Sequence, residues 1–194
     1  MITEIMPLQE LISMRGAEEV LEILSTFQCS YDADIENFLH NRAIDFEKIA
    51  KARTYLLCDA ALFQEGTINI LAYFALSLKV LILPEEMSIR ARKEYDGFSG
   101  KIHGQPVREI PCYLIGQLAR DSRIDSSVLS GSEIIDTAMS VIGPSFKGVG
   151  GRWVIIECHN TQPLIDFYEK NAFRFIMERP SEDIDMVQMI RKLV

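Results

Sequence analysis

Two apolar segments with one helical segment between them constrain the fold of this chain most strongly. Residues 112–119 are almost continuously apolar, and residues 152–158 have Val, Ile and Ile at their centre. Between them, apolar residues recur at helical spacing over 134–142 and stop at Gly143–Pro144, which predicts a helix that ends there. A strand, a helix and a strand in this order form a right-handed βαβ crossover. The two strands are therefore expected to be parallel and covered on both faces.

Segments on both sides of this unit predict a mixed α/β domain whose sheet is mostly antiparallel. Apolar spacing predicts an amphipathic helix over 15–27 and two short helices after it, the first capped by Asp32 or Asp34. Strand-forming residues around the turn at 64–66 predict an antiparallel hairpin. The second of the two short helices is expected around 46–50, and the hairpin strands at 54–62 and 67–77. The remaining expected segments are a long polar connection at 84–109, a helix starting near Pro163, and strands at 173–177 and 186–193 joined by the polar loop 180–185.

Six strands are expected from these segments, and the fold class that we predict is a sheet of six to seven strands with helices on both faces, in one domain over residues 1–194. A ligand in such a sheet binds at the carboxyl ends of strands, where the topology changes. That rule selects the residues after Ala119 and after Cys158.

The charge and the cysteine content narrow the classes of function. The chain has 28 acidic and 20 basic residues, a formal net charge of −8, which disfavours a generic nucleic-acid partner but leaves a tRNA partner open. The apolar stretch 68–83 is too short to span a bilayer, and residues 1–10 lack the basic cluster of a secretory signal. The four cysteines form no CxxC pair, so we expect buried, reduced thiols, no metal site and a cytoplasmic location without membrane attachment.

Two polar clusters follow the carboxyl ends of the two parallel strands. The first leads into a helix at Ser130, Gly131 and Ser132 and admits two interpretations. It is either a phosphate site at the helix N-terminus or a simple helix cap, and this segment alone favours the cap. The second cluster contains Tyr168, which is either an ordinary core tyrosine or a phenol directed into the gap between the parallel strands.

Other candidate residues have simpler structural explanations. The run Gly148–Gly151 precedes a strand instead of following one, so we interpret it as a strand lead-in and not as a phosphate loop. We expect His40 on a solvated helix face and His103 as a bystander in the long connection. A catalytic role for His159 stays open. Glu157 is equally well a general base or a salt-bridged carboxylate, so no base is assigned.

Four stretches together resemble the acetyl-CoA-binding core of the GNAT superfamily of N-acetyltransferases. The most specific is Phe167–Phe173, FYEKNAF, which is similar to the FYxxxGF signature of that family. The other three are 111–119, the helix start at Ser130–Gly131, and 157–160. The resemblance covers the C-terminal half, extends to the hairpin and is weak over the first fifty residues. It implies the acyl-CoA N-acyltransferase fold.

The resemblance also implies a role for each matching residue. In the family, the two parallel strands splay apart at a bulge and hold the pantetheine arm of the co-substrate acetyl-CoA between them. The residue that matches the family's tyrosine is Tyr168, which would act as general acid toward the departing CoA thiolate while the amine attacks the thioester directly. The matching cofactor-binding residues are Gln117, Leu118 and Ala119 for the pantetheine, Ser130, Gly131 and Ser132 for the pyrophosphate, Arg123 as an added cation, and Asn160.

The pyrophosphate loop departs from the family pattern, which is usually (Q/R)xxGx(G/A). Val128 stands where a glycine is usual, and a β-branched residue is stiff. Asp125 adds negative charge beside an anionic ligand, and Arg120 and Arg123 are the cations expected to offset it in part. Either the loop takes another route with Gly131 as its glycine, or the affinity for the cofactor is low. Ala172 also replaces the usual glycine of the C-terminal signature.

The resemblance predicts an N-acetyltransferase that acts on a primary amine of a small molecule or peptide. A toxin-type acetyltransferase that modifies aminoacyl-tRNA is one alternative, because 52–56 and 114–121 resemble that branch. A catalytically weak acyl-CoA-binding or interaction domain is the other alternative, suggested by the altered pyrophosphate loop. The acceptor pocket is expected from 35–50 and 84–109, and a homodimer through edge strands stays open.

Overall fold

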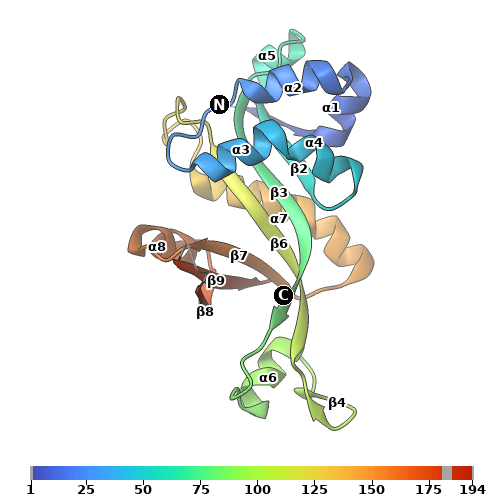
Figure 1. The fold of residues 1–194 in the computed structure, drawn as a ribbon, viewed down its shortest axis with the longest axis vertical. Helices are drawn as coiled ribbons and strands as arrows, with labels where there is room; N and C mark the ends of the chain where they lie inside the picture. The colour runs from blue at the N-terminus through green and yellow to red at the C-terminus, as the bar shows by residue number, and fades with distance from the viewer. Residues whose placement is uncertain (1, 181–184, 194) are drawn as a thin grey trace.

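The computed structural model describes residues 2–180 and 185–193, and its centre is a seven-stranded sheet (Figure 1). The strand order is β1-β2-β3-β6-β7-β9-β8, in which β6 and β7 are parallel and the other described neighbours are antiparallel. This confirms the predicted mixed α/β class and the parallel pair inside a mostly antiparallel sheet. The strands are β1 Thr3–Pro7, β2 Arg53–Asp59, β3 Ile70–Ile82, β6 Glu109–Arg120, β7 Trp153–His159, β8 Arg174–Pro180 and β9 Asp185–Lys192. Most of the polar loop expected at 180–185 lies outside the described residues.

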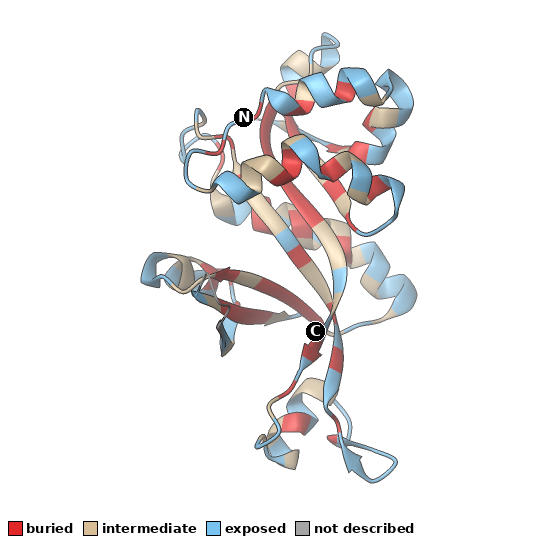
Figure 2. Cartoon of the chain, viewed as in Figure 1, coloured by how far each residue is buried: buried red, intermediate tan, exposed pale blue. Residues whose placement is uncertain are grey.

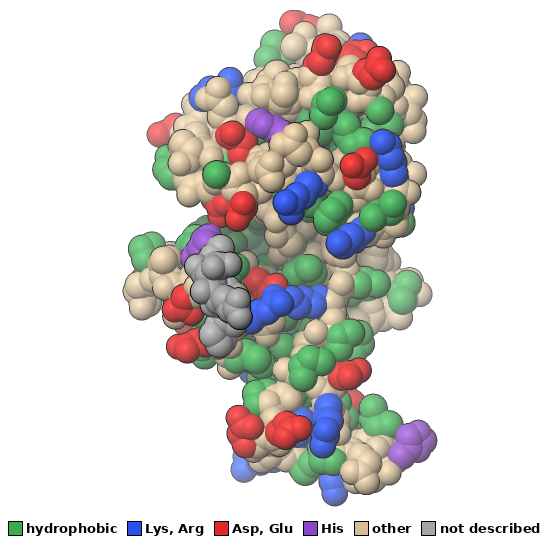
Figure 3. Space-filling model, viewed as in Figure 1, with side chains coloured by type: hydrophobic (Ala, Val, Ile, Leu, Met, Phe, Trp, Pro, Cys, Tyr) green, Lys and Arg blue, Asp and Glu red, His purple; other side chains and the backbone are tan. Residues whose placement is uncertain are grey.

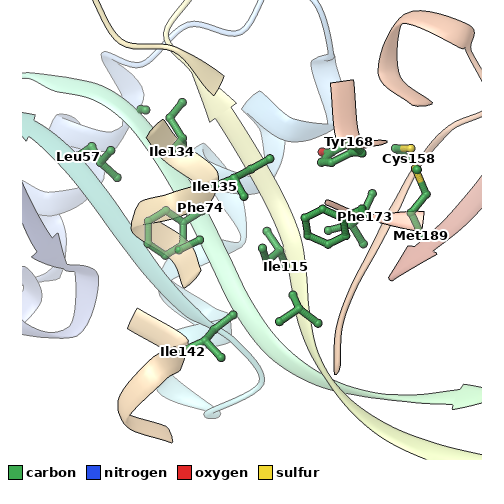
Figure 4. Packing of buried hydrophobic residues seen from close by; sticks show 14 of the residues in the cluster. Leu57, Phe74, Ile115, Ile134, Ile135, Ile142, Cys158, Tyr168, Phe173 and Met189 are labelled. Atoms are coloured by element: carbon green, nitrogen blue, oxygen red, sulfur yellow. The ribbon is translucent and has the colours of Figure 1, made fainter. Parts of the chain in front are cut away.

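Helices pack on both faces of the sheet, as predicted. Successive side chains of a strand point to opposite faces, so Tyr73 of β3 packs against the N-terminal helices and Phe74 packs against α7 (Figure 4). Ile134 and Ile135 of α7 are buried in the same cluster as Phe74. The helices in these two layers are α1 Leu8–Arg15, α2 Ala17–Ser25, α3 Ala33–Asn41, α4 Ala43–Lys48 and α7 Gly131–Val149.

The βαβ unit of β6, α7 and β7 forms, but two details of its prediction are wrong. α7 does not end at Gly143–Pro144 and continues to Val149. An internal proline removes one backbone hydrogen bond, and the packing of α7 on the sheet outweighs that loss. β6 is not covered on both faces, because Gly116 is exposed and the next two residues, Gln117 and Leu118, are only half-buried. The reason is that β7 leaves β6 partway along its length.

The N-terminal helices follow the prediction with shifted boundaries. Asp32 caps α3 by accepting hydrogen bonds from the N–H groups of Asp34 (2.9 Å) and Ile35 (3.2 Å). The helix expected over 15–27 is α2, and Gly16, with a φ of 82°, separates it from α1, which was not predicted. The left-handed φ explains why a glycine stands at this junction.

The hairpin of β2 and β3 is present, with a helical turn at its end. Residues 60–62 belong to the short helix α5 (Ala60–Gln64) and not to a strand. Asp59 starts this helix by accepting hydrogen bonds from its first N–H groups. His40 is half-buried, and its Nε2 bonds the carbonyl of Phe27 (2.9 Å), so the solvated position expected for it is wrong.

The segment 84–109 is folded, contrary to the irregular connection expected. It forms a distal lobe at one end of the long β3–β6 ribbon (Figure 1), and most of its surface is exposed (Figure 2). Its buried Arg92 donates hydrogen bonds to the carbonyls of Met87 (2.8 Å) and Val107 (2.5 Å). Trp153 of β7 anchors the lobe by bonding the carbonyl of Tyr95 (2.8 Å). The lobe contains α6 (Ile89–Asp96), β4 (Lys101–Ile102) and β5 (Gln105–Pro106).

The four cysteine thiols are buried and free, as predicted. The run Gly148–Gly151 forms the end of α7 and leads into β7, also as predicted. Within residues 2–180 and 185–193, no helix is both long enough and apolar enough to cross a membrane. The same residues contain no group of three His, Cys, Asp or Glu side chains arranged to hold a metal ion.

Candidate functional site

The two parallel strands separate partway along their length. β6 and β7 pair over three residues each, ending at Ile115 and Ile156, although β6 continues to Arg120 and β7 to His159. The register of β6 against β3 shifts at Gly116, which has no partner in β3. This bulge bends β6 away from β7, so the predicted splay is present. Beyond Ile115, backbone N–H and C=O groups of β6 face a gap, where only a ligand or water can satisfy them.

A cavity of about 530 Å³ occupies this gap. Its size falls within the range of small-molecule sites. Gln117, Leu118 and Ala119, the residues predicted to bind pantetheine, all line it. The other lining residues are Ile115, Gly116 and Arg120 of β6, Glu157, Cys158 and His159 of β7, Gly131 and Ile134 of α7, Leu164, Phe167 and Tyr168 of α8 (Gln162–Lys170), Met186 of β9, and five residues between Cys29 and Ile35.

Tyr168 lines the cavity and is only 9% exposed. Its ring packs edge-on against Phe167 and Phe173, with ring centroids 5.0 and 5.7 Å apart. Figure 4 shows the ring beside Cys158 and Phe173. Burial raises the pKa of the Tyr168 phenol, and the neighbouring Cys158 raises it further. Tyr168 is therefore a core residue that also presents a protonated phenol to the cavity.

The N-terminus of α7 is closed by its own side chains. The hydroxyl of Ser130 accepts a hydrogen bond from the N–H of Glu133 (3.2 Å), and the Glu133 carboxylate accepts one from the N–H of Ser130 (2.7 Å). This capping box supports the interpretation of Ser130 as a helix cap. Bonds from Ser130 also lower the pKa of Glu133, so a negative charge already stands at this helix end.

The next two residues of α7 differ in their positions. Gly131 lines the cavity, whereas Ser132 is exposed and lies outside the cavity wall. A Cβ atom at Gly131 would lie 2.8 Å from the ring of Phe167. Glycine at this position therefore permits the close contact between α7 and α8.

The loop that precedes α7 satisfies its own N–H groups. The Asp125 carboxylate accepts hydrogen bonds from the hydroxyl (2.7 Å) and the N–H (2.8 Å) of Ser127, and these bonds lower its pKa. The Asp125 carbonyl accepts from the N–H groups of Val128 (3.0 Å) and Leu129 (3.3 Å). The N–H groups of Ser127, Val128 and Leu129 are therefore already bonded within the loop.

Two arginines near α7 lie in different surroundings. Arg120 lines the cavity and donates a hydrogen bond to the carbonyl of Leu129 (2.9 Å), while its Nε is buried and has no partner among the described residues. Arg123 lies outside the cavity wall, where it pairs with Asp121 (2.7 Å) and bonds the carbonyl of Thr26 (2.8 Å). Both arginines were expected to offset the charge of Asp125, and only Arg120 lines the cavity; Arg123, also predicted as a cofactor-binding residue, lies outside its wall.

Two further parts of the chain that were expected at the cleft lie outside the cavity wall. Asn160, expected to contact the cofactor, lies outside the cavity wall, and its side chain donates to the carboxylate of Asp185 (2.9 Å). The segment 84–109, expected to form part of the acceptor pocket, forms the distal lobe and contributes no residue to the cavity wall. The segment 35–50 contributes Ile35.

Glu157 is the centre of a polar cluster at the cavity wall. Its carboxylate pairs with Lys79 (2.7 Å) and Arg179 (2.6 Å) and accepts a hydrogen bond from Gln188 (2.7 Å). Burial raises the pKa of this carboxyl, but the bonds from Gln188 and Lys79 outweigh burial and hold the pKa below its ordinary value. Glu157 is therefore the salt-bridged carboxylate of the two alternatives and is poorly suited to act as a general base.

Residues 29–34 form a cavity wall that the sequence analysis missed. Asp121, whose side chain is 1% exposed, accepts a hydrogen bond from the N–H of Gln28 (3.0 Å). The Ser122 hydroxyl accepts another from the N–H of Ser30 (2.7 Å). These partners are 93 and 92 residues apart in sequence, so no local motif marks this wall.

A contact joins this wall to β7 across the cavity. The Oδ2 atom of Asp32 lies 3.4 Å from Nε2 of His159, and both residues line the cavity. The other carboxylate oxygen of Asp32 accepts the hydrogen bonds that cap α3. The capping role of Asp32 was predictable from sequence, whereas its position beside His159 depends on the fold.

No family model and no curated protein sequence matches this chain, but its fold matches solved structures. A structure described as a bacterial toxin matches with a TM-score of 0.70 and 14% identity, covering 99% of this chain and 91% of the other. AtaT complexed with acetyl-methionyl-tRNAfMet matches with a TM-score of 0.66 and 18% identity, covering 96% and 94%. A tyrosine-to-phenylalanine mutant of KacT matches with a TM-score of 0.67 and 17% identity, covering 97% and 94%.

A structure of AtaTR bound with acetyl-CoA also matches, with a TM-score of 0.61 and 21% identity, covering 85% of this chain and 84% of the other. Identities this low establish a shared fold and leave the function to be argued from the site. The shared fold agrees with the fold that the sequence resemblance implied.

Proposed function

We propose that this chain is an acetyl-CoA-dependent N-acetyltransferase that transfers an acetyl group to a primary amine. The observation that carries the proposal is the separation of β6 from β7, which opens a cavity of about 530 Å³ between them. The cavity lies against the backbone of Gln117–Ala119 and the buried phenol of Tyr168. Proteins of this fold include AtaT, whose complex with AtaR has been solved with acetyl-CoA bound.

The groups around the cavity suit acetyl-CoA. Backbone N–H and C=O groups of β6 beyond Ile115 face the gap and match the amides of a pantetheine arm. Arg120, with its unpartnered Nε, and the N–H groups of Gly131 and Ser132 would hold the phosphates at the start of α7. Glu133 opposes this binding, because its carboxylate occupies the same helix end. When bound, acetyl-CoA supplies the activated acyl group.

The side chains and backbone of the site then supply orientation and a proton. Tyr168 keeps a proton on its hydroxyl, because burial raises its pKa, and it donates that proton to the departing thiolate. N–H groups of β6 beyond the bulge at Gly116 polarise the acyl carbonyl. These two contributions are those of a direct transfer, in which the amine attacks the thioester without a covalent enzyme intermediate.

Thermal unfolding with acetyl-CoA and the kinetics of Tyr168→Phe test this proposal. We expect millimolar acetyl-CoA to raise the Tm by several degrees, because a ligand at about 100 times its Kd stabilises the fold by about 2.7 kcal/mol. We expect Tyr168→Phe to lower kcat about 10²- to 10⁴-fold with little change in acetyl-CoA binding. Tyr95→Phe in the distal lobe is the matched control and should keep wild-type turnover. No shift in Tm with any acyl-CoA would overturn the proposal.

Aminoacyl-tRNA is the second candidate acceptor, because AtaT complexed with acetyl-methionyl-tRNAfMet shares the fold. The net charge of −8 argues against it. On the face shown in Figure 3, acidic and basic side chains are interspersed. Growth arrest on expression, abolished by Tyr168→Phe, would support this acceptor, and harmless expression of the wild type would exclude it. Tight acetyl-CoA binding without transfer to any amine would instead indicate an acyl-CoA-binding domain.

A further inference from the structure

We propose that His159, oriented by Asp32, is the general base that takes a proton from the ammonium group of the acceptor. This inference rests on the proposed acetyl transfer. Primary amines are mostly protonated at neutral pH, and an ammonium nitrogen has no lone pair with which to attack a thioester. The transfer therefore needs a group in the cavity that accepts a proton.

Four other ionisable groups of the cavity do not meet this need. The titratable and charged side chains that line the cavity with His159 include Asp32, which caps α3, Asp34 of α3, Arg120 of β6, Glu157 of β7 and Tyr168 of α8, and the carbonyl of Asp185 in β9 bonds the adjacent Asn160. Arg120 stays protonated, and Tyr168 keeps its own proton for the thiolate. Glu157 is committed to Lys79 and Arg179. Burial raises the pKa of the Cys158 thiol to about 11, so it carries a proton as well.

Asp32 is a fixed carboxylate that can orient the imidazole. Its Oδ1 accepts the capping hydrogen bonds from Asp34 and Ile35, and its Oδ2 faces Nε2 of His159 at 3.4 Å. A carboxylate at one ring nitrogen keeps the proton there and leaves the other nitrogen, Nδ1, as the base. The contact is longer than a hydrogen bond, and such contacts often shorten when substrate binds.

The positions of His159 and Tyr168 suit the two ends of the reaction. The His159 side chain is 45% exposed and stands at the rim of the cavity, which Tyr31, itself 82% exposed, also lines. Tyr168 is 9% exposed and lies deeper. An acceptor that enters from solvent meets His159 first, and the proton that His159 takes up can leave to water. Asp32 and Asp34 at the same rim attract a cationic amine.

The protons balance over the reaction. Nδ1 of His159 takes one proton from the ammonium, and the lone pair of the amine then forms the C–N bond with the acetyl carbon. The C–S bond breaks, its electron pair stays on sulfur, and Tyr168 gives this sulfur a proton. The second proton of the amine returns to Tyr168, and His159 releases its proton to water. The Asp32 carboxylate stabilises the transient imidazolium.

The pH dependence of turnover with a probe amine, glycinamide, tests the assignment. We expect His159→Gln to lower kcat/KM about 100-fold at pH 7. The deficit should shrink to about threefold near pH 9.5, because the amine is then unprotonated in solution. Tyr168→Phe should keep its deficit at both pH values. His103→Gln, in the turn between β4 and β5, is the matched control and should match the wild type. His159→Asn should show the same loss of turnover as His159→Gln. A wild-type Tm for both variants would show that the base is lost while the fold is retained.

A second experiment tests the role of Asp32 without relying on turnover. Asparagine caps a helix as well as aspartate does, so Asp32→Asn retains α3 and removes the negative charge. The chain has three histidines, whose ring resonances NMR can follow individually. We expect Asp32→Asn to shift the ring resonances of His159 and to leave those of His40 and His103 unchanged.

The possible outcomes distinguish a failure of the base assignment from a failure of the proposed function. Wild-type kcat/KM of His159→Gln at pH 7, or unchanged His159 resonances in Asp32→Asn, would overturn the base assignment and leave acetyl transfer intact. No turnover by the wild type with glycinamide, putrescine or methionyl-tRNA would overturn the proposed function, and the base assignment with it.

Discussion

At the residue scale, Glu157 shows how a carboxylate stays ionised inside the sheet. Bonds from Gln188 and Lys79 hold its pKa below its ordinary value of 4.5, so its ion pairs stabilise the fold at neutral pH. This stabilisation is complete above the pKa of the unfolded chain and is lost as the pH falls through the lower folded pKa. Because the folded-state pKa of this carboxyl is lowered, the free energy of unfolding decreases as the pH falls.

Denaturant unfolding from pH 7 to pH 3 measures this effect. We expect Glu157→Gln to be about 1–3 kcal/mol less stable than the wild type at pH 7. The difference should narrow toward zero at the acid end, where the wild-type carboxylate is protonated. Glu65→Gln, at an exposed turn, is the control. A difference that stays constant across this pH range would show that the ion pairs do not determine it.

A second residue, Gly131, sets the distance between α7 and the helix that carries Tyr168. A Cβ atom there would lie 2.8 Å from Phe167, so Gly131→Ala should push α8 away and destabilise the fold by about 1–3 kcal/mol. Acetyl-CoA binding should weaken as well. Gly143→Ala in the same helix meets open space and should stabilise by about 0.5–1 kcal/mol. Thermal unfolding of both variants checks this, and a neutral Gly131→Ala would contradict it.

At the scale of elements, the N-terminus of α7 carries its own anion. The Glu133 carboxylate bonds the N–H of Ser130, where a phosphate of acetyl-CoA would add further negative charge. We therefore expect Glu133→Gln to bind acetyl-CoA roughly two- to fivefold more tightly, as measured by isothermal titration. Asp136→Gln, further along α7, is the control. Weaker binding in Glu133→Gln would show that the phosphates lie away from this helix end.

Elements with a strong apolar period were predictable from sequence, as were the capped starts of α3 and α7, but several other element ends were not. α7 passes through Pro144 because its packing on the sheet outweighs one lost hydrogen bond. Residues 60–62 look like a strand by composition, yet Asp59 starts a helix there. The distal lobe was unpredictable for a different reason, since Arg92 holds it together through backbone carbonyls that no sequence pattern indicates.

At the scale of the whole molecule, half of the candidate site was predictable. β6, β7 and Tyr168 all lie in the C-terminal half and carry three of the four stretches that resemble the family. The opposite wall, residues 29–34, reaches the cavity through bonds to Asp121 and Ser122, which are more than 90 residues away in sequence. The same long-range packing turns Arg123 away from the cavity. Neither contact was predictable from the sequence, because both join residues far apart in the chain.

The measurement that tests the central claim most directly is a crystal structure of the chain with acetyl-CoA. We predict the pantetheine arm between β6 and β7, the thioester sulfur within hydrogen-bonding distance of the Tyr168 hydroxyl, and the phosphates near Arg120 at the start of α7. Acetyl-CoA bound outside this gap, or β6 and β7 paired closed beyond Ile115 and Ile156, would contradict the account.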